Sequence, residues 1–246
     1  MEMNAQPAEN QSEPKISVLE KLGLIFTNPV KVFKNITFFP DWITPIVLII
    51  VFSIASSFFV YDLQIDAQEK KILSNENIPE QQKEIIAERF DEARNSDTRM
   101  IQPIIGIIIF IFGSFALVAG VFLVTGKYIL GGEADFKTLL AVYGWGYLVA
   151  IPESIIKIPL MLAKNSIHVY TSLAILFDPS EADTILFKIA NAVDVFSLWR
   201  VVLWAIGFGI VFKFSQGRSY TVVGVLYVIY IAIYIGFSTL TGGMFG

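Results

Sequence analysis

Five stretches of the 246-residue chain are apolar and long enough to cross a bilayer as helices. A helix of about 20 predominantly apolar residues spans the hydrocarbon core. The stretches Ile43–Val60, Ile101–Thr125 and Tyr220–Thr241 contain no charged residue, and Thr138–Leu162 and Val195–Phe214 contain few. This pattern predicts an all-α integral membrane protein with five transmembrane helices, lying in a membrane domain that covers residues 42–241.

The segment between the first two spans is polar. Residues 61–100 mix ten acidic with six basic residues, and Ile85, Ile86 and Phe90 recur at helical spacing. We expect a helical hairpin outside the membrane. The polar segment 163–194 between spans three and four predicts two short helices at the surface.

Ahead of the first span, residues 1–15 are polar and acidic, which is typical of a disordered tail. In residues 16–41, Leu19, Leu22 and Phe26 repeat at helical spacing, and Asn28-Pro29 restarts a helix. We expect one or two amphipathic helices in the membrane interface. A soluble helix packed on the membrane bundle fits the pattern equally well.

Composition agrees with a membrane protein and excludes several functions. Hydrophobic residues make up 54% of the chain, charged residues 16%, and the mean hydropathy is +0.63. The net charge of −4 gives no sign of nucleic-acid binding, which usually leaves a basic patch. With no cysteine and only His168 as histidine, we expect no metal site and no cofactor.

The third span carries two charged residues, Glu153 and Lys157, which are unusual in a transmembrane helix, and two prolines, Pro152 and Pro159. A charge at the centre of a transmembrane helix costs roughly 2.5–3.5 kcal/mol on insertion scales, so such residues face partners or a wet cavity. Each proline lacks an N–H and displaces the carbonyl four residues earlier. The fourth span adds a further charge, Arg200.

Helical geometry places these charges at one depth. Measured from the centre of span three, Glu153 lies ~5 Å and Lys157 ~10 Å toward its C-terminal end. Arg200 lies ~7 Å toward the N-terminal end of span four, which is the same leaflet if the two spans are antiparallel. We therefore expect Glu153 to be shared by Lys157 and Arg200, with Asp194 capping the outer end of span four.

Two interpretations of this cluster stay open. It is either a binding or proton-relay site, helped by carbonyls freed at Pro152 and Pro159 as in transporters with broken helices, or a structural clasp between spans three and four.

Glycine recurs every seventh residue in span two, at Gly106, Gly113 and Gly120. Small residues on one face allow a neighbouring helix to approach closely. We expect helix packing there, including packing between copies in a homo-oligomer.

Three stretches carry a resemblance to a known family. They are Asn28–Phe33 leading to Pro40–Pro45 before span one, Leu130–Lys137 before span three, and Tyr143, Gly144, Trp145, Gly146 and Tyr147 running to Pro152 within it. Over roughly residues 25–240, with its five spans, the chain resembles the Yip domain family.

The resemblance implies five spans with a cytoplasmic N-terminus and an outer C-terminus. Eukaryotic members bind prenylated Rab GTPases and act in vesicle traffic and membrane shaping. This chain lacks their Asp-Leu-Tyr-Gly-Pro motif and has a short N-terminal segment. It resembles the prokaryotic branch, so we expect the inner membrane and no Rab GTPase partner. Lysines and arginines outside the spans divide evenly between the two sides, so charge does not orient the chain.

Two functions fit these observations. The first is a non-enzymatic membrane protein that organises lipids or partner proteins, and the second is a small transporter or ion-coupled permease that uses Glu153, Lys157 and Arg200. An intramembrane hydrolase fits poorly, because the sequence has no Gly-x-Ser-x-Gly and no His-Glu-x-x-His motif.

Overall fold

The computed structural model describes residues 14–75, 78–178, 181–182 and 184–240, so the predicted tail falls almost entirely outside the described residues. The described part is helical, without strands. Its α-helices are α1 (Val18–Thr27), α2 (Pro29–Phe38), α3 (Ile43–Leu73), α4 (Glu80–Asn95), α5 (Ile101–Leu123), α6 (Phe136–Tyr147), α7 (Ala150–Lys164), α8 (Ile185–Ala192), α9 (Val195–Phe212) and α10 (Gln216–Leu240). A π-helical turn, Val124–Ile129, extends α5, and a 3₁₀ turn, Leu173–Leu176, precedes α8.

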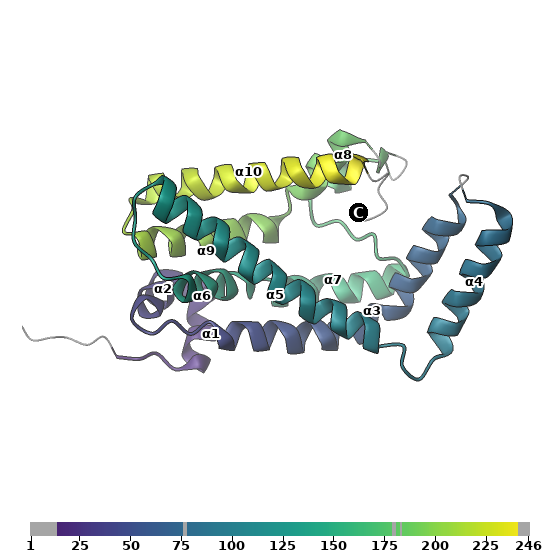
Figure 1. The fold of residues 1–246 in the computed structure, drawn as a ribbon, viewed down its shortest axis with the longest axis horizontal. Helices are drawn as coiled ribbons and strands as arrows, with labels where there is room; N and C mark the ends of the chain where they lie inside the picture. Colours follow the sequence, from purple (N-terminus) through teal and green to yellow (C-terminus); the bar gives the residue numbers. More distant parts are fainter. Residues whose placement is uncertain (1–13, 76–77, 179–180, 183, 241–246) are drawn as a thin grey trace, which may run out of the picture.

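Five helical segments are long and apolar enough to cross a membrane, as the sequence predicts. They are α3, α5 with its π-helical turn, α6 together with α7, α9 and α10. In Figure 1, α10 and α3 lie on opposite sides of the bundle, and α5 crosses between them. The chain is therefore an integral multi-pass membrane protein.

The first helix of the bundle does not end at Val60, where the apolar stretch stops. Helix α3 continues without a break to Leu73, so the first arm of the hairpin is the same helix as the span. After Pro45 this helix contains neither proline nor glycine, and nothing in the sequence interrupts it. The second arm is α4, and the two arms project from one end of the molecule (Figure 1).

An arginine holds the two arms of the hairpin together. The guanidinium of Arg94 on α4 contacts the carboxylates of Asp66, at 2.7 Å, and Glu69 on α3, and that of Asp91 on its own helix, at 3.1 Å. The hydrogen bonds to Glu69 and Asp66 raise the pKa of Arg94 above its usual value. Two acids of the α3 extension are thus neutralised by α4.

At the opposite end of the molecule lie α1 and α2 (Figure 1). Each begins with a side-chain cap, Ser17 for α1 and Asn28 for α2. The apolar face of α2, formed by Val32, Phe33 and Ile36, is fully buried against α9 and α6. Protein therefore covers this face of α2, whereas Leu19 on α1 is exposed, so both alternatives for residues 16–41 stay open.

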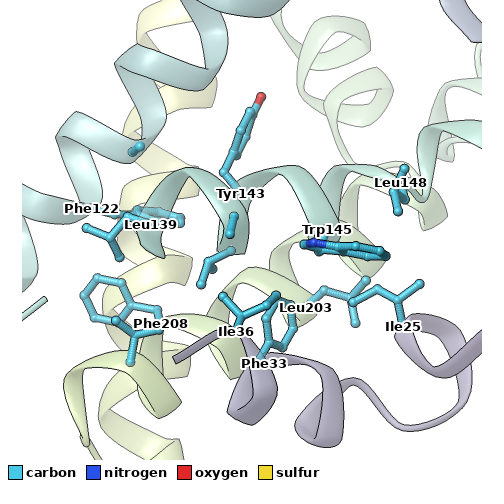
Figure 2. Packing of buried hydrophobic residues seen from close by; sticks show 14 of the residues in the cluster. Ile25, Phe33, Ile36, Phe122, Leu139, Tyr143, Trp145, Leu148, Leu203 and Phe208 are labelled. Carbon is cyan, nitrogen blue, oxygen red and sulfur yellow. The ribbon is translucent and has the colours of Figure 1, made fainter. Parts of the chain in front are cut away.

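The core of the bundle surrounds α6. This helix packs against α2, α3, α5 and α9, and Leu139, Val142 and Trp145 on it are fully buried. Figure 2 shows Leu139 beside Phe122 and Phe208, and Trp145 facing Ile25, while Tyr143 points to the other side of the helix. This packing fixes α6 and thereby the start of α7.

Candidate functional site

The third span is two helices rather than one. Pro152 has no N–H to donate to the carbonyl of Leu148, and the helix is interrupted at Leu148 and Val149. The Leu148 carbonyl instead accepts the N–H of Ile151 at 3.0 Å, and the Val149 carbonyl accepts the N–H of Glu153 at 3.2 Å. The carbonyl expected to be free at Pro152 is therefore satisfied by a tighter turn. Pro159 lies inside α7 without ending it.

The four charges predicted to meet do so where α7 passes the start of α9. Glu153 accepts hydrogen bonds at both oxygens, from Lys157 Nζ at 2.6 Å and from Arg200 Nη1 at 2.7 Å. Lys157 Nζ also lies 3.4 Å from Asp194 Oδ2. Two acids and two bases compensate one another, which is how charges are tolerated within a membrane protein.

Further contacts fix the two bases. The second Nη of Arg200 donates to Ser197 Oγ at 3.0 Å, and its guanidinium lies over the ring of Tyr147 at 5.5 Å. Lys157 Nζ lies 5.9 Å from the ring centroid of Phe196. The side chains of Glu153 and Arg200 are each only 16% exposed. The cluster ties α7 to α9 and still presents one side to its surroundings.

Asp194 is the N-cap of α9, as its position in the sequence predicts. Its Oδ1 accepts the backbone N–H of Phe196 at 2.8 Å, and its Oδ2 accepts the hydroxyl of Thr171. Burial alone raises the pKa of Asp194, but the Thr171 hydroxyl, the Lys157 ammonium and the Phe196 N–H lower it by more, so the net pKa lies below its usual value. The Asp194 carboxylate is ionised at neutral pH. Through Thr171 it ties the 165–194 segment, which connects α7 to α9, to the cluster.

A large cavity reaches this cluster from the hairpin end. It has a volume of about 1,670 Å³ and lies between α3, α4, α5 and α7. Glu153, Lys157 and Arg200 all line it, together with Tyr147 next to the helix break. The charged cluster is therefore accessible from a cavity rather than sealed within the bundle.

One wall of the cavity is a row of polar side chains on α3, which sequence reasoning missed. Ser53, Ser57, Tyr61, Gln64 and Gln68 all line the cavity. They recur at three- and four-residue spacing along one helix face. A search for this periodicity within the first span and its extension would have found them, whereas the hydropathy averaged over the span conceals them.

The family-motif residues lie at a crossing of helices. A Cβ added at Gly144 would lie 2.7 Å from the ring of Phe115 on α5 and 2.8 Å from Pro45 on α3, and one at Gly146 would lie 2.5 Å from Trp204 on α9. These two glycines allow three spans to approach α6 closely.

The two motif tyrosines lie beside the same crossing. The Tyr143 ring stacks on Trp204, with centroids 5.0 Å apart, and the Tyr143 carbonyl accepts the Trp204 indole N–H at 3.1 Å. Tyr147 lies 5.6 Å from Tyr143, ring to ring, and underlies Arg200. The motif thus connects the packed core to the charged cluster.

The glycines of span two are placed differently. A Cβ added at Gly106, Gly113 or Gly120 would meet no atom within 4 Å. No described helix of the same chain approaches them, so the close packing expected from their spacing is absent within the chain. Packing against a second copy stays a prediction.

A second charged contact, which the sequence did not reveal, lies at the α1 end. Lys21 is only 1% exposed and lies 3.5 Å from the Asp41 carboxylate and 5.5 Å from the centroid of the Trp145 ring. The indole N–H of Trp145 donates to the Asp41 carbonyl at 2.9 Å. This contact holds α1 and the start of α3 against α6.

The fold and the cluster define a class: a helical multi-pass membrane protein with a broken third span and a polar cavity. The model of the Yip1 domain matches residues 22–239, nearly the whole chain. The chain belongs to the Yip1 domain family. No curated protein and no solved structure is similar enough to match.

Proposed function

We propose that this chain is a non-enzymatic membrane protein that organises lipids, and that it does so by holding a lipid in the cavity between α3, α4, α5 and α7. The lining of the cavity carries the proposal. The polar row of α3 faces apolar side chains such as Ile107, Ile158 and Met161 across the same space. A cavity of mixed polarity in a membrane suits an amphipathic molecule, whose two ends need two environments.

Filling the cavity should displace the lipid. In the double variant Ser53→Trp/Ser56→Trp, two indoles replace small hydroxyls that line the cavity. We expect fewer lipids to remain bound to the purified protein, as counted by native mass spectrometry after extraction from membranes.

The matched control is Val51→Trp/Ala55→Trp, because these residues lie on the same helix but are exposed and outside the cavity lining. We expect this variant to retain lipids as the wild type does. Equal lipid retention by both double variants and the wild type would contradict lipid binding in the cavity.

A transporter is the second candidate, and one observation favours it. The cavity ends at the charged cluster beside the break in span three, and broken helices beside a polar site occur in secondary transporters. The cluster itself favours a structural role, because every charge in it has a partner.

We further propose that the α1 end faces the cytoplasm, that the hairpin and the 165–194 segment lie outside, and that the membrane is the inner membrane of a prokaryote. The family resemblance supports this orientation. An N-terminal tag should be inaccessible to an impermeant reagent in intact cells, and a cysteine placed at exposed Gln81 in the hairpin should be labelled. The reverse labelling pattern would contradict the orientation.

A further inference from the structure

The mouth of the cavity carries two arginines that have no acidic partner among the residues that the structure describes. Arg89 on α4 and Arg99 in the turn before α5 both line the cavity and are exposed. Arg89 shares a face of α4 with Ile86 and Phe90, which also line the cavity. Arg99 donates to the carbonyl of Arg94 at 3.4 Å and lies 5.6 Å from the centroid of the Tyr61 ring.

Two other basic residues of the hairpin, Arg94 and Lys83, are paired. Arg94 binds three carboxylates, and Lys83 lies 2.8 Å from Glu80. Within the described residues, neither Arg89 nor Arg99 forms an ion pair. The two arginines are therefore available to an anion that enters from outside the protein.

The charges of the cavity are unevenly placed. Its lining contains four basic side chains and two acidic ones. At the inner end Lys157 and Arg200 are compensated by Glu153 and Asp194, so the positive excess among the lining residues comes from Arg89 and Arg99, against Glu92. The two guanidinium groups can form charge-assisted hydrogen bonds with an anionic group there.

We infer that Arg89 and Arg99 bind the anionic headgroup of a phospholipid whose acyl chains enter the apolar part of the cavity. The inference rests on the proposed function and specifies its ligand. The guanidinium fork matches the geometry of phosphate oxygens and forms charge-assisted hydrogen bonds with them. Apolar residues on the walls, Phe52, Ile107, Ile158 and Met161 among them, provide the surroundings that acyl chains need.

The test uses the full chain in nanodiscs that contain phosphatidylglycerol and phosphatidylcholine in equal amounts. Native mass spectrometry measures the ratio of the two lipids that stay bound. The wild type should retain about fivefold more phosphatidylglycerol than phosphatidylcholine, because each of two exposed charge contacts contributes only modestly. In Arg89→Gln/Arg99→Gln the ratio should fall to about one, while the total number of bound lipids stays the same.

The control is Lys70→Gln/Lys164→Gln, which removes the same charge from exposed residues outside the cavity lining. It should keep the preference of the wild type. A preference that survives in Arg89→Gln/Arg99→Gln, or is lost equally in the control, would overturn the inference and leave lipid binding itself intact. Loss of lipid binding is tested separately by the tryptophan variants of α3.

A final arm separates a lipid headgroup from a free anion. Inorganic phosphate added to the wild type, with ionic strength held constant by chloride, should leave the preference unchanged. If inorganic phosphate abolishes it, the arginines bind a soluble anion and the inference is wrong.

Discussion

Replacing Glu153 with Gln should be the most destabilising single change in the charged cluster. The amide keeps the shape of the side chain but leaves Lys157 and Arg200 with Asp194 as the remaining carboxylate, and Asp194 contacts Lys157 rather than Arg200. Removing one partner from a buried ion pair typically costs roughly 3–5 kcal/mol, and partial exposure places this site near the lower figure. The measurement is thermal unfolding in detergent, with folded yield as a second readout.

The double variant Glu153→Gln/Arg200→Gln is the matched control. It removes the charge that Glu153→Gln leaves uncompensated, so it should recover part of the lost stability. Lys157→Gln should be milder, because Glu153 then keeps Arg200. Wild-type stability in Glu153→Gln would show that the cluster does not clasp α7 to α9.

The same variant separates the two candidate functions. In a transporter, Glu153→Gln should abolish flux at normal levels of folded protein. In a lipid-organising protein, it should lower the folded yield, and the protein that folds should still retain lipid in the cavity.

Gly144→Ala should destabilise the bundle about as strongly. The new Cβ would lie within 3 Å of the ring of Phe115 and of Pro45; the Pro45 ring is part of the α3 backbone, and the Phe115 ring is buried at 1% exposure. Overpacking of a dense core costs about 1–3 kcal/mol and sometimes more. We expect a lower unfolding temperature and a loss of monodisperse protein in size-exclusion chromatography.

Gly224→Ala on α10 is the comparison for this effect. A Cβ added there meets no atom within 4 Å, so the substitution should leave stability unchanged or slightly improve it, because alanine favours a helix over glycine. If both variants unfold at the same temperature, Gly144 is not at a close helix crossing.

The parts of this molecule that followed from the sequence are those governed by regular spacing. Long apolar stretches, three of them free of charge, predicted the five spans. The 1.5 Å rise per residue placed Glu153, Lys157 and Arg200 at one depth because each lies on a regular helix, and Asp194 was recognisable as a cap because it directly precedes an apolar run.

The rest depended on which residues meet across the fold. No local pattern distinguishes Gly144, which is enclosed by two rings, from Gly113, which faces open space. Lys21 reads as a surface lysine of an amphipathic helix, and only the arrival of Asp41 and Trp145 from elsewhere in the chain buries it. The cavity likewise needs four helices from separate parts of the sequence.

The unbroken course of α3 has a mechanical consequence. At 1.5 Å per residue its 31 residues form a rod of about 46 Å, which continues from the bundle into the projecting hairpin. Because α3 has no proline or glycine after Pro45 at which to bend, a load on the hairpin tilts the whole helix against α5, α6 and α7, on which it packs. The polar row of α3 would then move relative to α7, and a force applied to the hairpin would change the width of the cavity.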